Sequence, residues 1–121
     1  MATNRKLEDG RFLWLGVGAS KNSGDHVLVG AIPGVALMDT DTDNETTVDT
    51  GGVYALPVTA NDTADSGSAI SVGAKLYYDD GSSGLTAGEL TPDETNGTFF
   101  GYALEAVSSG DDATIKVKVG Y

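Results

Sequence analysis

Hydrophobic residues occur along this chain in short runs, and clusters of turn-forming residues separate one run from the next. The clearest run is Thr114–Val119, in which Ile115, Val117 and Val119 alternate with polar residues. Alternation with a period of two places the two sets of side chains on opposite faces of a β-strand. The runs are too short for helices, and Gly, Pro and Asp interrupt them too often. The pattern therefore predicts an all-β fold.

The stretch from Val27 to Val58 is the part around which the rest of the chain is organised. Hydrophobic runs at Val27–Ile32, Val35–Met38 and Val53–Val58 surround a polar segment at Asp39–Glu45. Gly and Pro between the runs are typical of tight turns. We expect consecutive strands of a small antiparallel sheet here.

Four further stretches extend this pattern. Phe12–Val17 is hydrophobic on both faces, which predicts a strand that is buried on two sides or lies in an interface. Lys75–Tyr78 predicts a short strand, and Leu85–Leu90 predicts a weak edge strand. Residues 59–73 are mostly small and polar. We expect them to form a loop with at most one short turn of helix.

The longest hydrophobic run is Thr98–Val107. Its alternation predicts that Phe100, Tyr102, Leu104 and Ala106 share one face of a strand. Together with the other runs, it gives about eight to nine short strands with a turn cluster about every ten residues. This number and spacing predict a small antiparallel β-barrel or sandwich.

Length and charge distribution suggest how the chain is divided. A chain of 121 residues has room for one domain with one core. We expect residues 1–10 to form a flexible, extended N-terminal arm and residues 11–121 to form a single β-barrel-like domain. The first 21 positions contain four of the seven basic residues and carry a net charge of +2, whereas the remainder carries −13. The basic start is either a solvated tail or an arm that meets an acidic partner surface.

Composition excludes several classes of protein. A net charge of −11 repels DNA phosphate and anionic lipid, so we expect no nucleic-acid partner and no membrane partner. The chain has no cysteine, which excludes disulfides, thiolate catalysis and cysteine-based zinc sites. No hydrophobic run approaches the roughly 18 residues of a membrane span, and the N-terminus lacks the pattern of a secretory signal. We therefore expect synthesis in the cytoplasm.

One motif resembles the start of a calcium-binding loop, because Asp39, Asp41 and Asp43 alternate and Glu45 follows. The match fails at the sixth position, where Asn44 replaces the glycine of the sharp turn. Helices flanking the loop are also missing from the pattern. Two interpretations stay open, a solvated turn and a weak cation site, and we assign no metal site.

Other candidate chemistry is weaker still. His26 lies close to Ser23 and Asp25, but near neighbours on an extended chain point in different directions and do not converge as a catalytic triad. Gly16–Lys21 lacks the ending of a phosphate-binding loop. Paired carboxylates for hydrolysis stay open in so acidic a chain, although no apolar pocket around a pair is indicated. We expect no catalytic residue and no cofactor.

Several motifs follow one another in a fixed order along the chain and end with the alternating last strand. They are Ser23–Asp25, Val27–Gly30, Gly34–Leu37, Gly52–Pro57, Gly73–Asp79, Gly101–Ala106 and Ser109-Gly110. This ordered set resembles a family of small tailed-phage capsid cement (head decoration) proteins, often mislabelled as RecA/RadA-like recombinases. The resemblance covers about Asp25 to Val119, with a longer Asp/Thr turn and with Phe99-Phe100 where a smaller residue is more usual.

The resemblance implies a structural protein without enzymatic activity that binds the outer surface of the assembled phage capsid and stabilises the shell. It also implies a homotrimer in the virion, with the major capsid protein lattice as partner. On this hypothesis Arg5, Lys6 and Arg11 contact the lattice. Two alternatives remain: a virion accessory or binding module of the tail or another surface structure, and a small hydrolase that uses carboxylates.

Overall fold

A computed structural model describes residues 11–63, 65–82 and 84–120, and within these residues it contains strands and no helix. The all-β prediction is therefore confirmed. The described residues form eleven strands rather than eight to nine, because β6, β7 and β9 have only two or three residues each and gave no clear pattern. The strands are β1 Phe12–Gly16, β2 His26–Val29, β3 Ile32–Ala36, β4 Glu45–Asp49, β5 Val53–Thr59, β6 Asn61–Thr63, β7 Ser66–Gly67, β8 Lys75–Asp79, β9 Leu90–Thr91, β10 Gly97–Ala103 and β11 Asp112–Val119.

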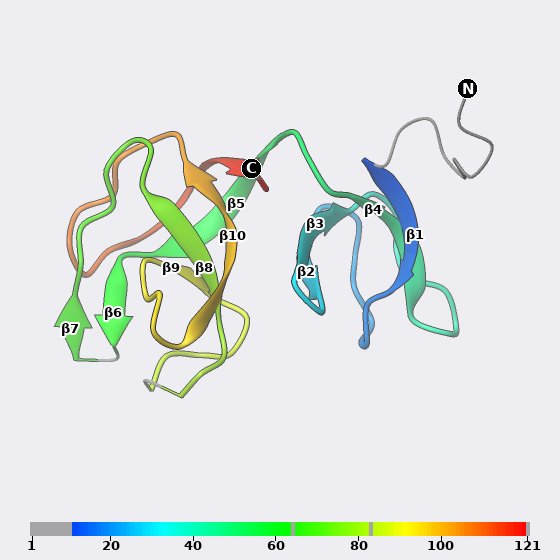
Figure 1. The fold of residues 1–121 in the computed structure, drawn as a ribbon, viewed down its shortest axis with the longest axis horizontal. Helices are drawn as coiled ribbons and strands as arrows, with labels where there is room; N and C mark the ends of the chain where they lie inside the picture. The colour runs from blue at the N-terminus through cyan, green and yellow to red at the C-terminus, as the bar shows by residue number, and fades with distance from the viewer. Residues whose placement is uncertain (1–10, 64, 83, 121) are drawn as a thin grey trace, which may run out of the picture.

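The strands form two main antiparallel sheets, which lie side by side and are joined between β4 and β5 (Figure 1). The first sheet has four strands in the order β1-β4-β3-β2, so β1 is an edge strand. The second sheet has five strands in the order β5-β11-β10-β8-β9. Its two edge strands, β5 and β9, also contact each other, so this sheet curls into a half-barrel.

The core fills the inner side of the curled sheet. Leu56, Leu76, Phe100 and Val117 are almost completely buried there, and Val35 from β3 joins the same cluster. Because β3 contacts both β10 and β11, the first sheet closes over one side of this core. The alternation predicted for the last strand is confirmed, since Ile115, Val117 and Val119 are all buried.

The predicted alternation of Thr98–Val107 is wrong beyond Phe100. A bulge between Phe99 and Gly101 shifts the register of β10 against β8. One extra residue in a strand moves all the following side chains to the opposite face. Phe100 therefore points into the core together with Ala103, whereas Tyr102 remains only half-buried.

The loop predicted for residues 59–73 is also partly wrong. Its first half forms a small hairpin from β6 and β7, and Ile70 makes an isolated bridge with Val107. Ile70 is 2% exposed, so it anchors the segment to the core. The weak edge strand predicted for Leu85–Leu90 is present only as the two-residue strand β9.

The prediction that Phe12–Val17 is buried on two sides does not hold within one chain. The strand β1 has one neighbour, β4, with Trp14 opposite Thr47 and Phe12 opposite Asp49. Phe12 and Trp14 are exposed, whereas Leu13 and Leu15 are half-buried. The alternative, a strand that lies in an interface, remains a prediction.

Candidate capsid-contact site

Arg11 is the one predicted capsid-contact residue within the described part of the chain, while Arg5 and Lys6 lie outside it. The Arg11 guanidinium makes two parallel hydrogen bonds to Asp49, Nε to Oδ1 at 2.7 Å and Nη2 to Oδ2 at 2.9 Å. Two parallel bonds fix orientation as well as distance. The Arg11 side chain keeps 46% of its surface exposed, whereas Asp49 is 1% exposed.

Asp49 collects further donors from the start of β5. The Tyr54 hydroxyl donates to Asp49 Oδ2, and the Gly51 N–H donates to Oδ1 at 3.0 Å. Burial by itself raises the pKa of Asp49, but the hydrogen bonds from Arg11, Tyr54 and Gly51 outweigh burial, so the pKa lies below its ordinary value of 3.8. The hydrogen bond to Asp49 likewise raises the pKa of Arg11. The pair is therefore fully ionised at neutral pH.

The backbone at Arg11 is held as firmly as its side chain. Its carbonyl oxygen accepts hydrogen bonds from the Thr50 N–H at 2.8 Å and from the Thr50 hydroxyl at 2.7 Å. Gly52 has a φ of +86°, and a Cβ there would lie 2.5 Å from Arg11 Nη2. A side chain at position 52 would therefore displace the guanidinium. These contacts fix the backbone and the side chain of Arg11 at the start of β1.

The acidic turn is closed by its own hydrogen bonds. Asp41 Oδ1 accepts from the backbone N–H of Asp43 at 2.9 Å and of Glu45 at 3.0 Å. Asn44 takes the left-handed conformation with φ 57°, which asparagine tolerates well. Carboxylate oxygens of Asp41, Asp43 and Glu45 lie within 4.8 Å of one another. This geometry is that of a hydrogen-bonded polar turn.

The side chains of Ser23, Asp25 and His26 each have a separate partner. The Ser23 hydroxyl donates to the Leu37 carbonyl, and Asp25 accepts from the Asn22 N–H. His26 is placed by β2 between the two sheets. There its Nε2 donates to the Gly88 carbonyl at 2.7 Å. These three residues therefore organise turns and the contact between the sheets.

His26 makes stability depend on pH. Burial lowers the pKa of His26 below its ordinary value of 6.5, and the hydrogen bond to Gly88 offsets only part of that effect. The unfolded chain therefore binds a proton at a higher pH than the folded chain does. The stabilising contribution of the neutral ring is present above pH 6.5 and is lost as pH falls from about 6.5 through the lower pKa of the folded state.

We expect the wild-type melting temperature to fall between pH 7.5 and pH 5.5. A His26→Gln variant should fall less, because glutamine keeps a donor for Gly88 and does not titrate. Thermal melts of both proteins at four pH values in this interval measure the effect. Equal slopes for the two proteins would contradict the assignment.

The strongest candidate for a catalytic carboxylate pair is structural. Asp79 and Asp93 are 1% and 3% exposed. Asp79 accepts from Gly81 N–H at 2.7 Å, while Asp93 Oδ1 accepts from Thr95 N–H at 3.1 Å, so each carboxyl caps a turn. Burial raises the pKa of Asp79, and the neighbouring Asp93 raises it further. Neither residue lines the groove beside His26 or the groove beside Phe99, and both carboxyls are used as turn caps.

A groove of about 620 Å³ opens where the edges of the curled sheet approach each other. Its walls come from β5, the start of β11 and the segment before β9, and His26 lies on one side. Glu89 and Asp112 are its acidic residues. Glu89 comes from the segment before β9 and Asp112 from the start of β11.

The fold and the site define the class of this protein. It is a small acidic β-protein whose charged clusters stabilise turns and strand ends, and no helix of the described residues is long and apolar enough to cross a membrane. The sequence model of the phage cement proteins matches residues 16–119, so the chain belongs to the phage cement protein family. The family indicates a structural, capsid-associated protein of a bacteriophage. Comparisons with curated proteins and with solved structures gave no match.

Proposed function

We propose that this protein is a head decoration protein that binds the outer surface of the assembled phage capsid and stabilises the shell without any enzymatic activity. The match to the phage cement family over residues 16–119 is the observation that carries the proposal. The roles of the acidic residues support it. The buried carboxyls of Asp49, Asp79 and Asp93 are used to hold the chain together.

The capsid contact that we propose begins at the N-terminus. Residues 1–10 are an arm that leaves the domain at Arg11, and Arg5, Lys6 and Arg11 contact the capsid lattice. Anchoring of Arg11 by Asp49 and Thr50 supports this model, because a fixed base directs the arm toward one surface. An extended segment that adds to a capsid strand gains backbone hydrogen bonds on docking.

The remaining parts of the proposal concern assembly and location. The protein is made in the host cytoplasm, associates as a homotrimer and is incorporated on the outer face of the virion, with the major capsid protein as partner. Nucleic acid and membranes are not partners, since a chain with a net charge of −11 is repelled by phosphate-rich surfaces.

Cosedimentation of the purified protein with expanded capsids of its own phage tests the proposal. We expect saturable binding at a fixed ratio to capsid subunits and a higher temperature of capsid disruption. Isolated capsid subunits serve as the control and should not bind. Failure to bind any capsid form, together with binding to tails, would instead assign the protein to a tail accessory structure.

A further inference from the structure

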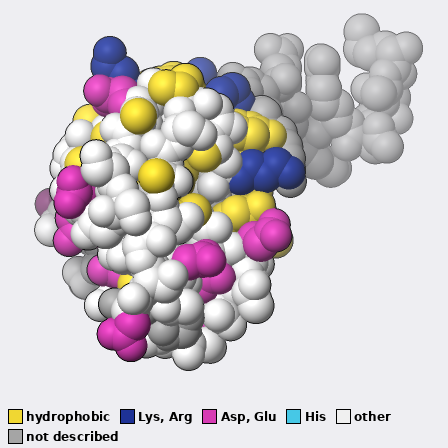
Figure 2. All heavy atoms as spheres, turned by 90° about the vertical axis from the view of Figure 1, so that its left-hand side faces the viewer, with side chains coloured by type: hydrophobic (Ala, Val, Ile, Leu, Met, Phe, Trp, Pro, Cys, Tyr) yellow, Lys and Arg dark blue, Asp and Glu magenta, His cyan; other side chains and the backbone are white. Residues whose placement is uncertain are grey.

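The outer face of the curled sheet differs in charge from the rest of the molecule. Acidic residues outnumber basic ones by eighteen to seven in the whole chain, yet three of the seven basic residues gather on this face. In the view of Figure 2, Lys and Arg side chains lie in the upper half among hydrophobic ones, and most Asp and Glu lie below them. We call it the lysine–aromatic face, formed by Lys75, Tyr77, Phe99, Tyr102, Lys116 and Lys118.

Strand register arranges the lysine–aromatic face. Tyr102 on β10 lies opposite Lys75 on β8 and opposite Lys118 on β11, so one tyrosine is flanked by two lysines. Phe99 stacks edge to face on Tyr102, with ring centroids 5.3 Å apart, and on Tyr77 at 6.2 Å. Rings held by their neighbours lose little entropy on binding, which favours them as contact residues.

The lysines remain available to a partner. Lys118 Nζ lies 5.9 Å from the centre of the Tyr102 ring, and Lys75 is exposed. Glu94 approaches this face at its rim, where it accepts a hydrogen bond from the Tyr77 hydroxyl at 3.4 Å. The chemistry of this face therefore fits a partner surface that combines carboxylates with an apolar group.

The other sheet of the same chain carries such a surface. Trp14 is 58% exposed, and it lies on β1 beside the strand β4 that follows the acidic turn. Gly16 lies two residues after Trp14 on β1, so positions 14 and 16 are on the same face of the strand. A Cβ at position 16 would lie 3.9 Å from Glu45 Cγ, so Glu45 is on this face as well. The carboxylate oxygens of Asp43 and Glu45 lie within 4.8 Å of each other. We call this surface the tryptophan–acid surface, formed by Trp14, Asp43 and Glu45.

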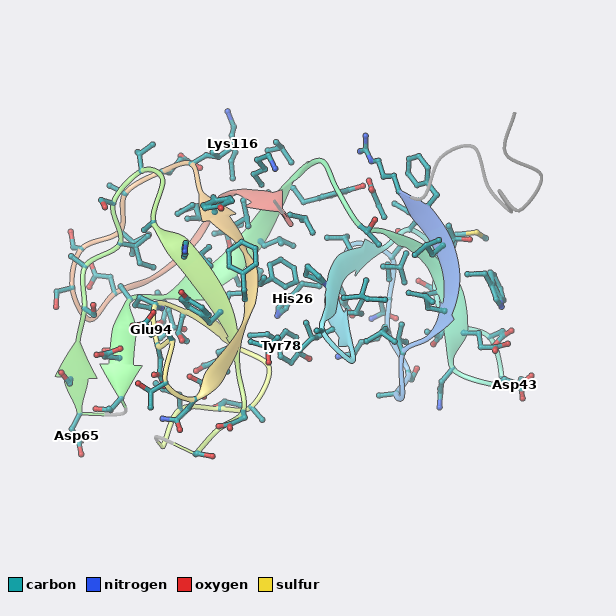
Figure 3. The ribbon with its side chains drawn as sticks, viewed as in Figure 1. His26, Asp43, Asp65, Tyr78, Glu94 and Lys116 are labelled. Atoms are coloured by element: carbon teal, nitrogen blue, oxygen red, sulfur yellow. The ribbon has the colours of Figure 1, made fainter. Side chains whose placement is uncertain are left out.

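The two surfaces lie toward opposite ends of the molecule. Figure 3 shows Asp43 at the far end of the four-stranded sheet and Lys116 on the five-stranded sheet. They cannot meet within one chain, whereas two copies placed head to tail bring them together. A head-to-tail contact closes into a ring when the rotation between copies fits the number of copies.

We propose that the lysine–aromatic face of one copy binds the tryptophan–acid surface of the next copy, and that this contact builds the oligomer. The inference rests on the proposed function in one respect, that the ring closes with three copies. It also accounts for the edge strand β1, on which Phe12 and Trp14 are 44% and 58% exposed. Nucleic acid is a poorer occupant of the lysine–aromatic face, because the net charge of −11 opposes its approach.

Charge reversal tests this contact in the full-length protein. Light scattering during gel filtration should show wild-type protein as a multimer of the 12.4 kDa chain. A Lys75→Glu/Lys118→Glu variant should run as a monomer, and so should an Asp43→Lys/Glu45→Lys variant. The latter keeps Asp41, whose carboxylate closes the acidic turn. A variant with all four substitutions should recover the wild-type mass, because the attraction is restored with opposite signs.

Matched controls separate the contact from general charge effects. Asp62→Lys/Asp65→Lys makes the same charge change as Asp43→Lys/Glu45→Lys, but on the exposed β6–β7 hairpin, and should leave the mass unchanged. Circular dichroism and thermal melts confirm that each variant folds. A monomeric wild-type protein, unchanged masses after either reversal, or no recovery in the fourfold variant would overturn the inference.

Capsid cosedimentation of the same variants distinguishes this inference from the proposed function. If the wild-type protein binds capsids but the oligomer mass does not change on charge reversal, the copy-to-copy contact is rejected and the cement function is retained. If charge reversal dissociates the multimer but the wild-type protein binds no capsid, the copy-to-copy contact is retained and the cement function is rejected. A Lys75→Glu/Lys118→Glu protein that stays multimeric but loses capsid binding would assign the lysine–aromatic face to the capsid and overturn the copy-to-copy contact.

Discussion

Removal of residues 1–10 is expected to abolish saturable binding to expanded capsids and to leave folding and oligomer mass unchanged. The domain retains Arg11, the two bonds from its guanidinium to Asp49 and the hydrogen bonds from Thr50 to its carbonyl, so β1 keeps its anchor. The proposed arm loses Arg5 and Lys6 together with the backbone groups that would pair with a capsid strand. Cosedimentation across a concentration series measures the loss, and light scattering checks the mass.

A second variant separates charge from chain length in this prediction. Arg5→Glu/Lys6→Glu keeps all ten residues and reverses only the two charges. This variant should bind the capsid more weakly than the wild-type protein does. Added salt should weaken the binding of the wild-type protein, because ions screen charges in water. Wild-type binding by the truncated protein would reject the arm model and place the capsid contact within residues 11–121.

Much of the fold was predictable because local patterns and tertiary structure agree in these strands. The last strand is the best case, since the hydrophobic positions at Ile115, Val117 and Val119 are the buried ones. The consecutive antiparallel strands predicted for Val27–Val58 are confirmed for β2, β3 and β4, with Gly30 in the first turn at a φ of +60°. The strand β5 belongs to the second sheet, so the prediction of one sheet for this stretch is wrong there. Period and turn chemistry are local properties, and the sequence displays them directly.

Features that depend on distant partners could not be predicted. Arg11 and Asp49 are 38 residues apart, and only the pairing of β1 with β4 brings them together. The lysine–aromatic face went unrecognised for the same reason, because its residues come from β8, β10 and β11. Asn44 offers a local signal, since asparagine is one of the few residues that accept a positive φ.

The bulge in β10 has a large energetic consequence that a pair of neighbouring substitutions can measure. Phe100 is 0% exposed and packs in the core, where its ring meets His26 edge to face at 5.8 Å. Phe99, the preceding residue, lies on the outer face of the same strand and is half-buried. Simple alternation also separates these two residues, but the bulge lets both Phe99 and Tyr102 point outward.

Phe100→Ala is therefore expected to destabilise the protein by about 3–5 kcal/mol, the usual cost of removing a buried phenylalanine and leaving a cavity. Domains of this size are stable by about 5–15 kcal/mol, so a large share of the total would be lost. At a protein concentration low enough for the chain to be monomeric, Phe99→Ala should cost only about 1 kcal/mol, since it removes edge-to-face contacts at a partly exposed surface. Urea unfolding of both variants gives the two values, with equal slopes as the check on two-state behaviour. Equal losses, or a larger loss at Phe99, would mean that β10 has a different register and that the lysine–aromatic face is not on the outside of the sheet.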